Sequence, residues 1–142
     1  MEKLSKAFSY VLMLYSAMML SWGILGFIEY FTQTVVVAPL QNPTFPPGTQ
    51  FIHWLLITLS GATYLYGYVN RWPYTPLAMP LLFGMLSSMC FIQTFDFMIA
   101  PSRYVAFAIE CIMYIGISVY LLRSQLLQKR FGKLQISHES IT

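Results

Sequence analysis

Four ionisable side chains lie in or beside long apolar stretches of this 142-residue chain: Glu29, His53, Asp96 and Glu110. Inside a membrane such groups are costly, and they usually face a protein interior, a partner or a water-filled cavity. Two carboxylates with different surroundings can act as acid and base, which makes Glu110 and Asp96 candidate catalytic residues of a small-molecule pocket. A histidine with carboxylates can also bind a metal ion, so all four are candidate metal ligands, although no local motif such as H-x-x-x-H supports this.

Two other interpretations of these residues require no catalysis. In the first, Glu110 has a structural role and is hydrogen-bonded to Tyr64 or Tyr114, because a buried carboxyl group needs a partner. In the same interpretation Arg103 pairs with the carboxylate of Asp96 or of Glu29. In the second, Glu110 or Glu29 contacts a polar group of another subunit. We favour the structural role, and the sequence indicates no particular cofactor.

The composition indicates a membrane protein. Apolar residues make up 57% of the chain and charged residues 9%, against roughly 25% charged in an ordinary soluble domain. Four apolar stretches, residues 7–31, 51–69, 76–100 and 104–122, are long enough to cross a bilayer core, which needs roughly 20 helical residues. Only helices satisfy their own backbone hydrogen bonds in lipid. We therefore predict a single domain, an all-α membrane protein built as a four-transmembrane-helix bundle.

The connecting segments predict the orientation. The segment Thr32–Gln50 carries no charge and four prolines, which rule out a continuous helix and predict a proline-rich outer loop. With four spans, the N-terminus, the turn at 70–75 and the C-terminus lie on one side. That side carries all the Lys and Arg residues except Arg103. By the positive-inside rule, both termini are expected in the cytoplasm.

The basic tail, residues 123–142, contains Leu127, Phe131 and Leu134 at helical spacing among basic residues. This pattern is typical of a helix that rests on anionic lipid headgroups, and the alternative is a docking surface for a cytoplasmic partner. The basic residues are few and lie where lipid phosphates account for them. We therefore expect no nucleic-acid partner.

Small and sulfur-containing residues give predictions about packing. Small residues let membrane helices approach closely. The candidate packing positions are the pairs Ala17/Ser21 and Gly84/Ser88 and, in the second stretch, Ser60, Gly61 and Ala62. The two cysteines, at positions 90 and 111, have no metal-type spacing, and we interpret both as small apolar side chains.

The sequence contains no G-x-S-x-G, C-x-x-C, P-loop or dinucleotide-binding motif. We therefore expect a non-catalytic accessory or structural subunit of a larger membrane complex, with the bilayer and other membrane subunits as its partners. In size and composition it is analogous to small multi-pass subunits of respiratory, photosynthetic or oxidase complexes. The alternative is a small-molecule- or metal-binding membrane enzyme or transporter with a polar site in the outer half around Glu110 and Asp96.

Overall fold

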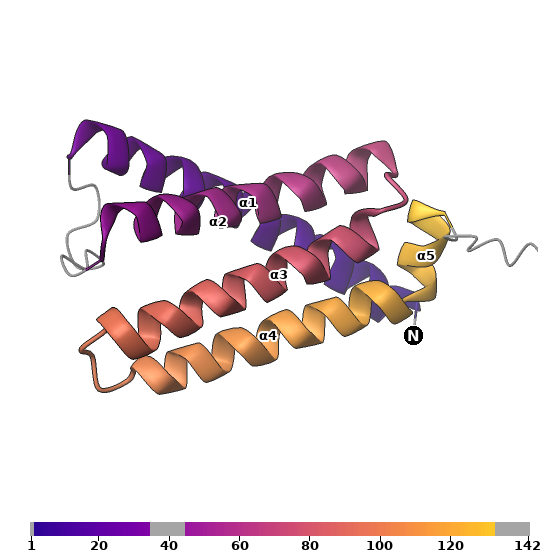
Figure 1. Ribbon diagram of the computed structural model, residues 1–142. Coiled ribbons are helices and arrows are strands. Elements are labelled where there is room, and N and C mark those ends of the chain that lie inside the picture. The colour runs from indigo at the N-terminus through magenta and orange to yellow at the C-terminus, as the bar shows by residue number, and fades with distance from the viewer. Residues whose placement is uncertain (1, 35–44, 133–142) are drawn as a thin grey trace, which may run out of the picture.

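The computed structural model describes residues 2–34 and 45–132, and all regular structure in these ranges is helical. The elements are α1 (Glu2–Thr32), α2 (Pro47–Asn70), α3 (Thr75–Ile92), the π-helix η2 (Gln93–Phe97), α4 (Arg103–Arg123) and α5 (Gln125–Phe131). The four long helices lie in the order α1, α2, α3, α4, each in contact with the next (Figure 1). The predicted all-α fold is confirmed for the described residues.

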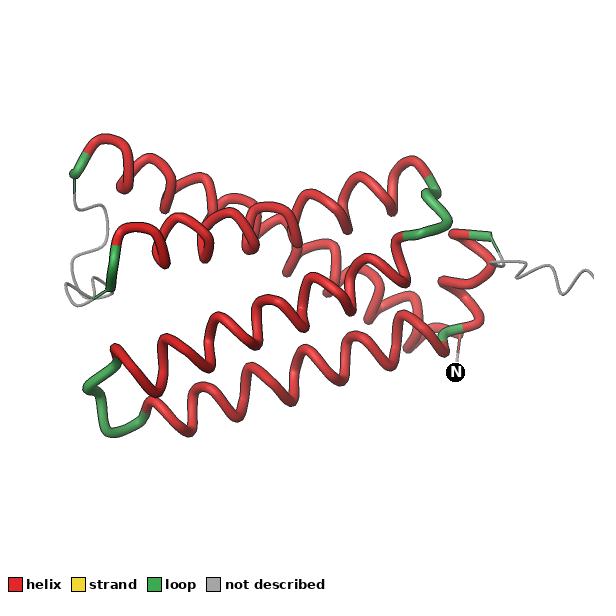
Figure 2. The backbone as a smooth tube through the Cα atoms, in the orientation of Figure 1, coloured by secondary structure: helices red, strands yellow, loops and turns green. Residues whose placement is uncertain are grey.

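Successive long helices run in opposite directions and are joined at their ends (Figure 2). The start of α1, the turn after α2 and the short helix α5 lie at one end of the molecule (Figure 1). We call this the basic end, because its described residues include the following cations: Lys6, Arg71, Arg123, Lys129 and Arg130. The start of α2 and the turn between η2 and α4 lie at the opposite end (Figure 1).

Three helical segments are long and apolar enough to cross a membrane: Ser5–Thr32, Thr75–Phe97 and Arg103–Arg123. They coincide with three of the predicted spans. The segment Thr75–Phe97 corresponds to the predicted span 76–100 and ends at Phe97 rather than at residue 100. The predicted span 51–69 is present as the 24-residue helix α2, but it is not among these three segments. Its hydroxyl groups, glycines and tyrosines lower its mean hydropathy.

The α1–α2 interface is built from small residues. Buried positions of α1 alternate in spacing between three and four residues, as in a coiled-coil seam: Ser9, Leu12, Ser16, Met19, Gly23 and Gly26. Gly61 of α2 approaches so closely that a Cβ atom there would lie 2.6 Å from the Leu20 nitrogen. Ser60 and Gly61 are buried, as predicted for packing positions, whereas Ser21, Gly84 and Ser88 are exposed and do not pack within the described bundle. A four-residue spacing does not determine which face of a helix is buried.

The core continues to the basic end, where α5 closes it. Phe83 of α3 stacks on Tyr114 of α4, with ring centroids 4.8 Å apart. Leu127 and Phe131 of α5 are almost fully buried against the same core. The helix predicted in the tail is therefore present, but these two apolar side chains contact the protein. Leu134, and most of the proline-rich loop, lie outside the described residues.

Candidate functional site

The Glu110 side chain is half-buried and lies in a polar cluster made by three helices. The Cys90 thiol on α3 is within hydrogen-bonding reach of the Glu110 carboxyl group. On α1, the Tyr15 hydroxyl is within reach of the Tyr114 hydroxyl, and Glu110 acts electrostatically on both tyrosines. Glu110 therefore has polar surroundings supplied by α1, α3 and α4. Tyr114 shares this cluster with Glu110, whereas the Tyr64 hydroxyl lies near Ser9. The hydrogen bond from Glu110 to one of these two tyrosines stays a prediction.

Asp96 lies in η2, where its side chain is exposed. Gln93 is three residues before Asp96, a spacing that places two side chains on one face of an α-helix, but Gln93 is buried. The π-helix explains the difference, because the Met98 N–H bonds the Gln93 carbonyl oxygen at 2.9 Å, five residues back. This wider turn rotates the residues that follow Gln93 relative to an α-helix. Asp96 therefore faces outward, while Glu110 faces Cys90 and the tyrosines.

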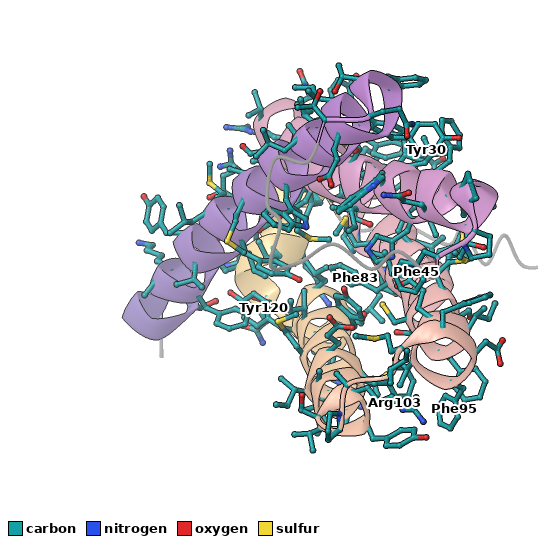
Figure 3. The ribbon with its side chains drawn as sticks, turned by 90° about the vertical axis from the view of Figure 1, so that its left-hand side faces the viewer. Tyr30, Phe45, Phe83, Phe95, Arg103 and Tyr120 are labelled. Atoms are coloured by element: carbon teal, nitrogen blue, oxygen red, sulfur yellow. The ribbon has the colours of Figure 1, made fainter. Side chains whose placement is uncertain are left out.

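Arg103 begins α4 beside the end of η2, and Figure 3 shows it near Phe95 at the edge of the α3–α4 pair. Its guanidinium group donates to the Met98 carbonyl oxygen and, at 2.7 Å, to the Tyr104 hydroxyl. These contacts take the place of the expected pairing with Asp96. They also stabilise the turn between η2 and α4, since Met98 lies in that turn and Tyr104 lies in the first turn of α4.

The four candidate metal ligands do not form a cluster. Asp96 is exposed, Glu29 is half-buried in the last turn of α1, and His53 is half-buried near the start of α2. The His53 ring packs edge-on against Trp54, and its Nδ1 atom is buried with no hydrogen-bond partner among the described residues. Across residues 2–34 and 45–132, no group of three or more His, Cys, Asp or Glu side chains is placed to bind a metal ion.

A second polar region lies at the basic end, and the sequence did not predict it. The Tyr120 hydroxyl of α4 donates to the Ser5 carbonyl oxygen of α1 at 2.8 Å and lies 2.9 Å from the Ser5 hydroxyl (Figure 3). On the other side of this end, the Arg130 Nε donates to the Tyr68 carbonyl oxygen at 3.0 Å. Its guanidinium carbon lies 3.8 Å from the centroid of the Tyr68 ring. These contacts tie α1 to α4 and α5 to α2.

Tyr15 and Cys90 also escaped the sequence analysis. Neither residue is part of a recognised motif, and a cysteine side chain is as common in an apolar core as in a polar contact. One signal was present: Cys90 lies three residues before Gln93 and therefore near its face of the helix. The contact with Glu110 depends on how α3 and α4 are rotated against each other, which a single sequence does not specify.

The chain matches no protein-family model, and no curated protein or solved structure shows significant similarity to it. The fold therefore defines its class: a helical protein in which three of the described helices are able to cross a membrane. Its function has to be argued from its own residues.

Proposed function

We propose that this chain is a four-span membrane protein with both termini in the cytoplasm, and that it serves as a non-catalytic subunit of a larger membrane complex. In this proposal the partner is a transmembrane helix of another subunit, which packs on the exposed side of α3. The observation that carries the proposal is the exposure of Gly84 and Ser88, two small residues one turn apart on a helix able to span the bilayer.

The direction of the helices supports four spans. Helices α1 and α3 run the same way, and α2 returns between their ends (Figure 1). If both cross the bilayer, the chain must cross it again between them. The 24 residues of α2 extend about 36 Å at the helical rise, enough for a hydrocarbon core of roughly 30 Å. Its polar side chains are tolerated because Ser60, Tyr64 and Gly67 are buried inside the protein.

The charges support the orientation. Six Lys or Arg residues in the described ranges belong to segments at the basic end, and Arg103, the first residue of α4, lies at the opposite end. The positive-inside rule places the end that is rich in Lys and Arg in the cytoplasm when the loops are short.

Labelling of introduced cysteines with a membrane-impermeant maleimide tests both points. Gly48 and Asn70 are exposed at the two ends of α2, and a Cβ at Gly48 would meet nothing within 4 Å. In intact cells we expect Gly48→Cys to react and Asn70→Cys to react only after permeabilisation. If both positions react from the same side, α2 does not span and the topology is wrong. The reverse pattern would overturn the orientation alone.

The exposed side of α3 suits a second helix better than it suits lipid alone. Glycine inside a helix costs about 1 kcal/mol relative to alanine, and a Cβ at Gly84 would meet nothing within 4 Å. The intramolecular packing therefore does not require glycine there. In membranes, small residues one turn apart let a second helix approach closely. A shallow groove beside Ser88, lined also by Phe91 and Phe107, extends this surface towards α4.

The matched test compares two exposed glycines on different faces. Gly84→Leu is expected to release the protein from its complex during gentle-detergent purification, measured by native mass spectrometry. Gly116→Leu is the control, because a Cβ at Gly116 also meets nothing within 4 Å, and it should leave the complex intact. If the wild-type protein travels alone, the subunit proposal fails. If Gly84→Leu stays in a stoichiometric complex, this contact surface is wrong.

A further inference from the structure

A pocket at the basic end concentrates positive charge. It has a volume of about 400 Å³ and lies between α1, α5 and the end of α2. Its lining includes Lys6, Arg71, Lys129 and Arg130 with the two tyrosines Tyr10 and Tyr68, and none of its lining residues is acidic. Like charges this close repel one another, and a bound anion would remove that cost.

The fold fixes the guanidinium group of one of these cations and the backbone of another. Arg130 uses its Nε for the Tyr68 carbonyl oxygen and stacks on the Tyr68 ring, so its terminal amino groups remain available to a ligand. Arg71 ends α2 in a left-handed conformation, with φ 54°, and its N–H bonds the Gly67 carbonyl oxygen. The Arg130 guanidinium group is thereby prepositioned, which lowers the entropy cost of binding. Arginine suits phosphate because it can donate two parallel hydrogen bonds.

An apolar track leads away from the pocket along α1. Tyr10, which lines the pocket, is followed at four-residue intervals by Leu14 and Met18. The exposed fractions of Tyr10, Leu14 and Met18 are 69%, 73% and 60%. Residues four apart lie on one side of a helix, and this helix is able to cross a membrane. A charged pocket continuous with an exposed apolar track matches an amphiphile better than it matches a free ion.

We propose that the pocket binds the phosphate-bearing headgroup of an anionic phospholipid, with an acyl chain along Tyr10, Leu14 and Met18. This inference rests on the proposed membrane topology, which places the pocket at the cytoplasmic leaflet, where anionic lipids and basic pockets between helices meet. It does not depend on the proposed partner subunit. A firmly bound lipid here would join α1, α2 and α5.

The test measures lipid binding to the purified full-length protein by native mass spectrometry, with a phosphatidylinositol phosphate and with phosphatidylcholine. The variant is Arg71→Gln. The matched control is Arg123→Gln, an exposed cation at the same end that does not line the pocket. We expect Arg71→Gln to weaken binding of the anionic lipid about tenfold and Arg123→Gln less than about twofold. Lys129→Gln provides a second pocket variant should Arg71→Gln express poorly.

Competition by inorganic phosphate and by water-soluble inositol phosphate separates the two sources of phosphate. If the lipid remains bound, the lipid assignment stands, whereas full displacement would assign the pocket to a soluble phosphate compound and overturn it. Equal weakening by Arg71→Gln and Arg123→Gln would reduce the effect to the general surface charge and overturn the site. Labelling at Gly48 and Asn70 is repeated on each variant, so that a failed site is distinguished from a failed topology.

Discussion

Replacing Gly61 with alanine tests the close contact between α1 and α2. A Cβ at this position would lie 2.6 Å from the Leu20 nitrogen and 2.6 Å from the Ser16 carbonyl oxygen. Both are backbone atoms of α1, so no side chain can rotate away to make room. The two helices would have to separate along a seam that also buries Gly23 and Gly26.

The expected magnitude follows from two opposing terms. Overpacking of a well-packed interface costs about 1–3 kcal/mol, and the rigidity of the backbone atoms places Gly61→Ala in the upper part of that range. Alanine in place of glycine inside a helix gains about 1 kcal/mol. The same gain applies to Gly116→Ala, where a Cβ meets nothing within 4 Å. The difference between the two variants therefore isolates the steric term, about 2–3 kcal/mol.

The assay is reversible unfolding in mixed detergent micelles, followed by tryptophan fluorescence. Trp22 and Trp54 report on this interface, since their rings lie 6.3 Å apart across α1 and α2. Gly61→Ala should unfold at a lower denaturing-detergent fraction than the wild type, and Gly116→Ala at an equal or higher one. Equal stability of the two variants would show that α1 and α2 do not pack as described.

Three further variants test other contacts by the same unfolding assay. Tyr120→Phe removes the hydroxyl that donates to Ser5 and should cost about 1 kcal/mol; no loss would refute the link between α1 and α4. Leu127→Ala should lower the free energy of unfolding by about 2–5 kcal/mol, because this side chain is fully buried. Leu122→Ala, at an exposed position, should change it little, and equal effects of the two variants would mean that α5 rests on lipid. Glu110→Gln keeps the shape and hydrogen-bonding capacity of the side chain, so stability and complex assembly should persist. Loss of a host-membrane activity with assembly intact would instead favour the acid–base alternative.

The lengths and order of the helices could be predicted because apolar stretches longer than a bilayer core leave few alternatives. Their ends were less predictable. The third stretch remains apolar through Ala100, but regular structure ends at Phe97 after a π turn. A π turn inserts one residue into the hydrogen-bonding pattern without a compositional signature. This single feature places Asp96 away from the face on which Gln93 is buried.

The tail shows a different limit. The spacing of Leu127 and Phe131 correctly predicted a helix with an apolar side, now α5. The same spacing fits a helix on lipid and a helix on protein, because apolar side chains are stabilised in both environments. The kink that turns α5 back onto the bundle lies at Ser124, whose ψ of 114° ends α4. Serine at a helix junction is too common to reveal such a turn from the sequence.

The position of α2 shows what mean hydropathy measures in such a protein. Ranked from most to least apolar, the three candidate spans are α4, α1 and α3. The fraction of buried residues in their most apolar stretches rises in the same order, from 17% to 28% to 33%. Helices with more lipid contact need more apolar side chains, and helices surrounded by protein can carry hydroxyl groups and glycines. Helix α2 is not among these candidate spans, and it contacts α1, α3 and α5. Its small and polar residues Ser60, Gly61 and Tyr64 are buried inside the protein, where such side chains are tolerated. The Gly61 experiment tests the packing of this helix on α1, and the Gly48/Asn70 experiment tests whether it crosses the membrane.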